Sequence, residues 1–218
     1  MNHLTVLARP PVAGSAKTRL SPALPARLAA ELAGAMLADT LAAAGACAAD
    51  VRAIGWSELA GAVAVPPGFA SFAQPAGDLG ARLDDAFRRA FTARHSRAVV
   101  IGSDAPALTP AHLDDAFAAL ATHDVVVGPA ADGGYWLLGL AAPAPALLRD
   151  VPWSTAEVCA LTLRRAADAG LRAATLATLS DLDTPADLAA LVGECARGAG
   201  HPCGAHARAA LRAMGFVP

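Results

Sequence analysis

Short apolar runs alternate along this chain with segments whose apolar residues recur every three or four positions. Short runs are typical of buried strands, and the wider spacing is typical of one face of a helix. The pattern predicts strands at Leu4–Ala8, Val51–Trp56, Phe69–Gln74, Ala98–Ile101, Val125–Val127, Tyr135–Leu140 and Ala173–Leu176. It predicts helices through Leu24, Leu28, Leu32 and Met36, through Leu79, Leu83, Phe87 and Phe91, and through Leu113, Phe117 and Leu120.

Four expected helices carry a start signal of a capping residue, an early proline or both. The signals are Ser21-Pro22, Thr109-Pro110, the S-x-x-E spacing of Ser154–Glu157, and Thr184-Pro185 with Asp187. Because Thr184, Pro185 and Asp187 account for the start of the final long helix, Asp183 is left without a structural role.

The order of elements predicts the fold class. Strands that alternate with helices favour an α/β fold with a mostly parallel sheet covered on both faces, and 218 residues suffice for one core. In open sheets of this kind, ligands bind at the carboxyl ends of the strands. The loops that hold Lys17, Asp104 and Asp183 all follow predicted strands, so one site could collect these three side chains.

Composition narrows the class of partner. A formal net charge of −2 gives no basic footprint for nucleic acid. The apolar stretches are broken well short of the roughly 20 residues of a membrane span, and the N-terminus does not have the pattern of a signal peptide. The four cysteines include no C-x-x-C pair, which favours reduced thiols and a cytoplasmic location.

The loop after the first strand, residues 9–20, is rich in Pro and Gly and contains Lys17, the one lysine among seventeen basic residues. Lys acts at a phosphate as a point charge, whereas Arg acts as a planar fork. Lys17-Thr18 suggests a Walker A loop, but Pro11 and Ala16 stand where that motif has glycines. A loop with Lys17 and Arg19 before a helix suits a di- or triphosphate, the alternative being an ordinary solvated basic loop.

Two aspartates that follow predicted strands, Asp104 and Asp183, are candidate ligands of Mg²⁺ or Mn²⁺, because hard cations prefer carboxylate oxygens. The alternative for Asp104 is a turn or capping role. Asp132-Gly133-Gly134 permits close approach of a ligand to the backbone, or forms a plain hairpin turn. Trp153 is a candidate substrate wall or a core residue.

The C-terminal segment 195–218 is rich in Gly, Ala and His, and we expect it to be a partly disordered tail after a domain that spans residues 1–194. Cys195, His201, Cys203 and His206 allow a zinc site, but their spacing matches no standard finger.

Taken together, the motifs resemble those of the radical-SAM/selenodomain-associated transferase 1 family. This family lies within the GT-A nucleotide-diphospho-sugar transferase superfamily, which also contains 2-phospho-lactate guanylyltransferases and sugar-nucleotide pyrophosphorylases. The segments that carry the resemblance cover about residues 3–192. They are Pro10–Leu20, Gln74 with Gly77–Gly80, Gly102–Pro106, Gly128-Pro129 with Asp132–Gly139, Trp153–Thr155, and Asp181–Leu188.

The resemblance implies a single-domain GT-A (Rossmann-like) three-layer sandwich and a set of site residues. Nucleotide binding would fall to Ala8, Arg9, Pro10, Gly14, Lys17, Arg19, Gln74, Asp78 and Gly80, with Gln74 and Gly80 at the base. The metal pair would be Asp104 and Asp183. The acceptor side would consist of Gly133, Gly134, Tyr135, Trp153, Ser154 and Thr155. The catalytic residues would be Lys17, Arg19 and Asp132.

Three functions remain open at the level of the sequence. The first is metal-dependent transfer of NMP from a nucleoside triphosphate to a small phosphorylated or hydroxylated acceptor, with release of pyrophosphate. The second is glycosyl transfer from a nucleotide-sugar, with Asp132 as general base. The third is a non-catalytic nucleotide-binding module.

Overall fold

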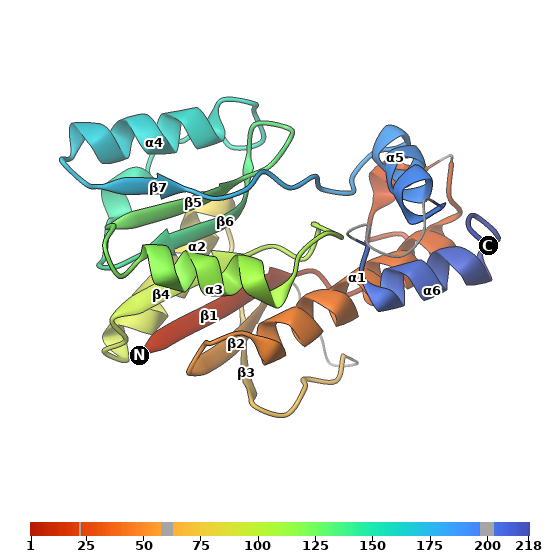
Figure 1. Ribbon diagram of the computed structural model, residues 1–218, viewed down its shortest axis with the longest axis horizontal. Coiled ribbons are helices and arrows are strands. Elements are labelled where there is room, and N and C mark those ends of the chain that lie inside the picture. Colours follow the sequence, from red (N-terminus) through yellow and green to blue (C-terminus); the bar gives the residue numbers. More distant parts are fainter. Residues whose placement is uncertain (22, 58–62, 197–202) are drawn as a thin grey trace.

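A computed structural model describes residues 1–21, 23–57, 63–196 and 203–218 (Figure 1). Every predicted strand is present, with ends that differ from the prediction by at most two residues. The strands are β1 (Asn2–Ala8), β2 (Val51–Trp56), β3 (Phe69–Ala73), β4 (Arg97–Ile101), β5 (Val125–Pro129), β6 (Tyr135–Leu140) and β7 (Ala173–Thr175). The helices are α1 (Ala26–Ala46), α2 (Leu79–Thr92), α3 (Pro110–Ala119), α4 (Val158–Asp168), α5 (Pro185–Ala196) and α6 (Ala205–Ala213), with short 3-10 helices η1 (Thr18–Leu20) and η2 (Pro145–Leu147).

The seven strands form one sheet in the order β3-β2-β1-β4-β6-β5-β7. All neighbouring strands are parallel except at β6, which is antiparallel to both β4 and β5. Helices cover both faces, as Figure 1 shows. The predicted α/β three-layer architecture with a mostly parallel sheet is therefore confirmed.

Successive side chains of the central strands pack alternately into two separate hydrophobic cores, one on each face of the sheet. Val99 and Ile101 of β4 pack with α1 and α3, whereas Val100 of the same strand packs with α2 and α4. Successive strand side chains point to opposite faces, so a strand buried on both faces is apolar throughout. This is why β4, β5 and β6 appear in the sequence as continuous apolar runs.

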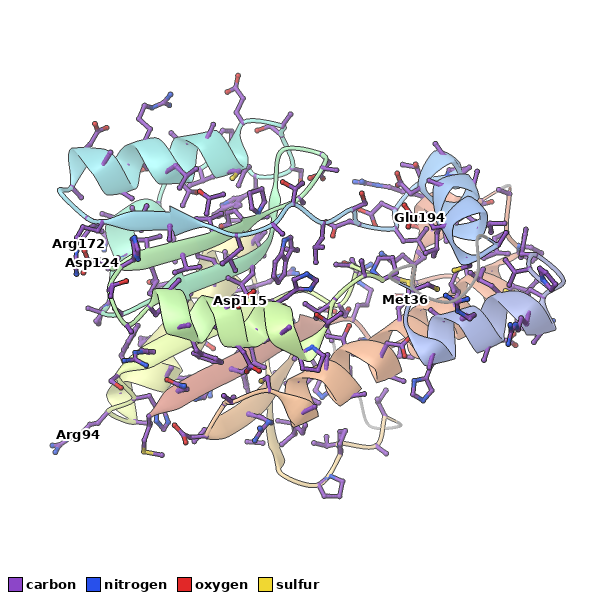
Figure 2. All side chains as sticks on the ribbon, viewed as in Figure 1. Met36, Arg94, Asp115, Asp124, Arg172 and Glu194 are labelled. Atoms are coloured by element: carbon purple, nitrogen blue, oxygen red, sulfur yellow. The ribbon has the colours of Figure 1, made fainter. Side chains whose placement is uncertain are left out.

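A third core lies beyond the carboxyl ends of the parallel strands, where α5 and α6 pack beside the N-terminal half of α1 (Figure 1). Met36, labelled in Figure 2, belongs to it together with Leu188 and Leu211. This packing explains a property of α1: it is long and apolar enough to span a membrane by length and composition, yet its apolar residues line the cores of the fold. Among the described residues, no other helix passes that test.

The described part of the C-terminal segment is structured where the sequence suggested a weakly structured tail. Helix α6 docks on α1, and the carboxylate of Asp39 accepts the backbone N–H groups of His206 and Ala207 at 2.9 and 2.8 Å. Residues 197–202, which include the zinc candidate His201, lie outside the described residues. The boundary between residues 194 and 195 falls within α5.

Two predicted helix starts are wrong. Helix α1 begins at Ala26, after the N-cap Pro25, because a helix that began at Ser21 would place Pro25 past its first turn, where it would remove a hydrogen bond and clash. Helix α4 begins at Val158, and Ser154 has a φ of +66°, whereas an N-cap needs extended backbone. Thr109 and His112 form a capping box at the predicted start of α3.

Candidate active site

The loop after β1 brings Lys17 back over the carboxyl edge of the sheet. Arg9 donates from Nη1 to the carbonyl of Ser15 at 3.2 Å, and the carbonyl of Val12 accepts the N–H groups of Ser15 and Ala16. The chain then reaches Lys17, whose φ of +50° is left-handed. A non-glycine residue adopts that conformation at a cost of about 1–3 kcal/mol, so the surrounding contacts must hold it. The loop is thus organised to present one side chain.

Lys17 joins the two candidate metal ligands. Its Nζ lies 2.5 Å from Oδ1 of Asp104 and 2.9 Å from Oδ1 of Asp183, and the Lys17 side chain is only 8% exposed. Burial acts to lower the pKa of Lys17, but the carboxylates of Asp104 and Asp183 prevail and raise it above its usual value. Arg19 is exposed, with Nη1 4.0 Å from Oδ2 of Asp183. Residues far apart in sequence thus converge at one point, as the sequence allowed.

The loops that carry the two aspartates are tied together. The backbone N–H of Leu182 donates to the carbonyl of Asp104 at 2.9 Å. At the start of α5, Oδ2 of Asp187 accepts the N–H groups of Asp183 and Thr184 and the hydroxyl of Thr184. The predicted roles of Thr184 and Asp187 at this helix start are confirmed, and the Asp183 side chain takes no part in the cap.

The third side of the site is the turn between β5 and β6. Oδ1 of Asp132 accepts the N–H of Gly134 at 2.9 Å, which fixes the turn. Gly133 has a φ of +90°, and a Cβ there would lie 2.1 Å from the carbonyl oxygen of Ala156, so only glycine fits. Its carbonyl accepts the N–H of Cys159 at the start of α4. The turn and the segment before α4 therefore hold one another.

Two adjoining cavities open at this edge. One, of about 330 Å³, lies toward α2; the other, of about 590 Å³, lies over the first loop. Both are lined by Leu7, Arg9, Asp104, Asp132, Ser154 and Thr155. The smaller cavity is also lined by Ala8, Gln74, Gly134, Tyr135 and Trp153, and the larger one by Lys17, Arg19 and Asp183. Most of the predicted site residues therefore line one or both of two cavities that share six residues.

Five predicted site residues do not line these two cavities. Pro10 and Gly14 belong to the first loop, and Gly133 is enclosed by the segment before α4. Asp78 caps α2 by accepting the N–H of Ala81 at 2.9 Å, and Gly80 is packed so closely that a Cβ would lie 2.6 Å from the carbonyl oxygen of Leu148 and 2.9 Å from Trp153.

Asp78 and Gly80 instead border a separate groove. It measures about 760 Å³, lies between α2 and residues 140–150, and is lined by none of Asp104, Asp132, Asp181 and Asp183. Size alone therefore does not identify the site in this fold. A direct nucleotide contact for Asp78 or Gly80 remains a prediction.

Three polar residues of the smaller cavity were not predicted as site residues: Ser57, Arg82 and Asp181. Each has a buried side-chain polar atom with no hydrogen-bond partner. Burial, and then the charges of Asp104, Asp132 and Asp183, raise the pKa of Asp181 to about 7. Ser57 follows β2 just as the other candidates follow their strands, which was a usable signal. Arg82 is one of sixteen arginines, and no pattern distinguished it.

The carboxylates fit a divalent cation by their chemistry. Asp104, Asp132, Asp181 and Asp183 supply carboxylate oxygens around the two cavities, and Oδ1 of Asp181 has no partner, although no three such side chains of the described residues are grouped closely enough to enclose an ion. Asp104 and Asp183 are 49% and 43% exposed, so an ion and its water can reach them. Oxygen donors of this kind are what Mg²⁺ and Mn²⁺ prefer.

The sheet order and the helices on both of its faces match the fold of a candidate nucleotide-diphospho-sugar transferase of known structure. Within that class, the chain belongs to DUF2064, a family described as an uncharacterized protein conserved in bacteria, which matches residues 27–155. No curated protein matches the chain.

Solved structures show the same fold. A candidate nucleotide-diphospho-sugar transferase from Desulfovibrio desulfuricans G20 is 27% identical, with a TM-score of 0.87 over 97% of this chain and 94% of that one. Rv0371c from Mycobacterium tuberculosis H37Rv in complex with manganese is 20% identical, with a TM-score of 0.56 over 87% and 96%. CMP:2-keto-3-deoxy-manno-octonic acid synthetase complexed with CTP is 13% identical, with a TM-score of 0.56 over the same shares, 87% and 96%.

Proposed function

We propose that this chain is a metal-dependent nucleotidyltransferase that transfers NMP from a nucleoside triphosphate to a small acceptor and releases pyrophosphate. The observation that carries the proposal is the convergence of Lys17, Asp104 and Asp183 at the carboxyl edge of the sheet, beside the two cavities. A buried ammonium and carboxylates from separate strand ends are the groups that phosphoryl-type transfer needs.

In this mechanism the first loop binds the triphosphate. Lys17 and Arg19 neutralise the β- and γ-phosphates, and the Gly14 turn lets the backbone approach them. Mg²⁺ or Mn²⁺, when bound by Asp104 and Asp183, would supply charge that stabilises the phosphates and the leaving pyrophosphate. The ammonium of Lys17 contacts both carboxylates, so a metal bound by Asp104 and Asp183 would take over their charge and leave the ammonium to bind phosphate oxygens.

The chemical step is one substitution at phosphorus. An oxygen of the acceptor forms a bond to the α-phosphorus, and the bond from that phosphorus to the oxygen that bridges the α- and β-phosphates breaks. Asp132, exposed at the rim of both cavities, can take the proton of a hydroxyl acceptor. Tyr135, Trp153, Ser154 and Thr155 orient the acceptor, and Gln74 lies on the side of the base. Positioning and charge neutralisation supply most of the acceleration.

The comparisons support a transferase of this class. One related structure contains CTP and another contains manganese, the substrate type and cofactor type proposed here. The motifs described above also resemble the radical-SAM/selenodomain-associated transferase 1 family.

Glycosyl transfer from a nucleotide-sugar is the second candidate. It is favoured by the relative from Desulfovibrio, a candidate nucleotide-diphospho-sugar transferase that matches nearly the whole chain. A metal held by the same carboxylates would then supply the charge that stabilises a departing nucleoside diphosphate, and Asp132 would be the base.

Product identity separates the two candidates. The protein is incubated with Mg²⁺ or Mn²⁺, a panel of small phosphorylated and hydroxylated acceptors, and either nucleoside triphosphates or nucleotide-sugars. We expect pyrophosphate from a triphosphate and no nucleoside diphosphate from a nucleotide-sugar. Nucleoside diphosphate release without pyrophosphate would replace this proposal with glycosyl transfer, and metal-dependent nucleotide binding without either product would favour a non-catalytic module.

A further inference from the structure

Arg82 of α2 has no partner for its guanidinium among the described residues. It lines the smaller cavity, and its Nε is buried without a hydrogen bond. None of the ion pairs of the described residues includes it. By contrast, Arg88 and Arg89 on the same helix both pair with Asp85. Arg82 is only partly buried, but a buried N–H donor without an acceptor is costly, so this arrangement favours an acceptor from outside the chain.

Two further donors that line this cavity lack an acceptor, although the carboxylates of Asp104, Asp132 and Asp181 line other parts of it. The hydroxyl of Ser57 and the indole Nε1 of Trp153 are buried and have no hydrogen-bond partner. Of the seven described side-chain atoms in that condition, four belong to Ser57, Arg82, Trp153 and Asp181, which line this one cavity, whereas the Tyr135 hydroxyl lies beside Thr162 of α4. Unsatisfied polar atoms are rare in folded proteins, and their concentration here indicates a ligand site.

The position of this group sets it apart from the proposed triphosphate site. Lys17, Arg19 and Asp183 line the larger cavity, whereas Ser57 and Arg82 line only the smaller one. Trp153 and Tyr135, whose rings meet edge to face at 6.4 Å between centroids, form a wall of the smaller cavity. Arg82 is therefore placed to contact the second substrate rather than the phosphates held by Lys17.

We propose that the acceptor carries an anionic oxyanion group, a carboxylate or a phosphate, which Arg82 binds through its guanidinium with the hydroxyl of Ser57. The planar guanidinium can donate two parallel hydrogen bonds to the two oxygens of such a group. Hydrogen bonds between charged groups are shorter and stronger than those between neutral groups. The anchored oxyanion is separate from the acceptor oxygen that attacks. That the bound anion belongs to the acceptor substrate rests on the proposed function, but the anion site itself can be tested without turnover.

The test measures binding of small probes through tryptophan fluorescence, because Trp136 and Trp153 line the cavity. Glycerol 3-phosphate, lactate and neutral glycerol are titrated into the protein with Mg²⁺, with and without an α,β-methylene triphosphate analogue. The variants are Arg82→Gln, Ser57→Ala and the matched control Arg94→Gln, whose exposed side chain projects outward from the edge of the molecule in Figure 2 and lines neither cavity. Melting temperatures establish that each variant is folded.

We expect the wild type and Arg94→Gln to bind one of the two anions and not glycerol, and the preferred anion distinguishes phosphate from carboxylate. Arg82→Gln should raise the Kd for that anion about 10- to 100-fold, and Ser57→Ala should raise it less. Binding of the triphosphate analogue should be the same in all variants.

Two results would show that Arg82 holds no anion: no anion binding by the wild type, or equal anion binding by wild type and folded Arg82→Gln. Loss of triphosphate-analogue binding in Arg82→Gln would also overturn the proposal, because Arg82 would then be a nucleotide contact. If the wild type binds an anion through Arg82 but binds no triphosphate analogue, the anion site stands and the proposed function fails.

Discussion

At the scale of single residues, Lys17 shows how much a composition can reveal. A chain that uses arginine at sixteen of seventeen basic positions has a lysine at the one position where two carboxylates meet. The side chain is 8% exposed and reaches both carboxylates with a single atom, a geometry that suits a compact ammonium better than a planar guanidinium. The sequence could suggest the residue, but only the fold brings Asp104 and Asp183 to it.

Lys17→Arg is therefore expected to impair turnover although it keeps the charge. The larger head group cannot occupy the same buried point without displacing Asp104 or Asp183, so kcat for pyrophosphate release should fall about tenfold or more. Arg27→Lys, the converse exchange at an exposed position on α1, serves as the control and should leave kcat unchanged. Equal activity in Lys17→Arg and wild type would mean that Lys17 acts only as a positive charge.

At the scale of elements, the apolar pattern located the strands well but located helix starts less well. A strand buried on both faces has to be apolar along its length, so β4, β5 and β6 were visible in the sequence. Helix starts depend on contacts made across the fold. The S-x-x-E spacing of Ser154–Glu157 did not produce a cap, because that segment packs on the Gly133 turn and α4 begins only at Val158.

The packing of that segment on the turn predicts a large effect of Gly133→Ala. The added Cβ would lie 2.1 Å from the carbonyl oxygen of Ala156, at a φ of +90°. Strain and overpacking together should lower the free energy of unfolding by about 2–4 kcal/mol. Gly170→Ala is the matched control: its φ is +70°, but no atom lies within 4 Å of the new Cβ, so about 1 kcal/mol is expected. Similar losses in urea unfolding of the two variants would refute this account of the turn.

At the scale of the whole molecule, the sequence predicted the architecture and the order of strands and helices along the chain, and most of the site residues that it predicted line the two cavities. It did not predict the third core, because the apolar residues of α6 are buried only by contact with α1, which is distant in the sequence, and with α5. It also missed Arg82 and Asp181, whose importance comes from the absence of partners around buried atoms. At the opposite edge of the sheet, by contrast, Arg172 and Asp124 form an ion pair, and Figure 2 shows them side by side.

Stability of the whole molecule should depend on pH through His3. Burial, and then the charge on the neighbouring His95, lower the pKa of His3 from 6.5 to about 4. The unfolded chain therefore takes up a proton at pH values where the folded chain does not. The stabilisation is fully present above pH 6.5 and is lost as the pH falls toward 4, by about 3 kcal/mol in total.

Urea unfolding at pH 7, 5.5 and 4 tests this dependence against the variant His3→Gln, which cannot titrate at that position. The wild type should lose more stability than the variant across this range. Parallel losses in the two proteins would show that other groups account for the acid sensitivity.

The central claim, that one site binds a nucleotide through a metal held by Asp104 and Asp183, is tested most directly by a thermal-shift comparison of wild type and Asp104→Asn. Each protein is heated with ATP, GTP, CTP, UTP or nucleotide-sugars, with and without Mg²⁺ or Mn²⁺. A ligand that binds only the folded chain raises Tm by mass action. We predict that one triphosphate raises the wild-type Tm only with metal, and that a folded Asp104→Asn variant loses this rise. No rise for any nucleotide in the wild type, or the same rise in Asp104→Asn, would contradict the account.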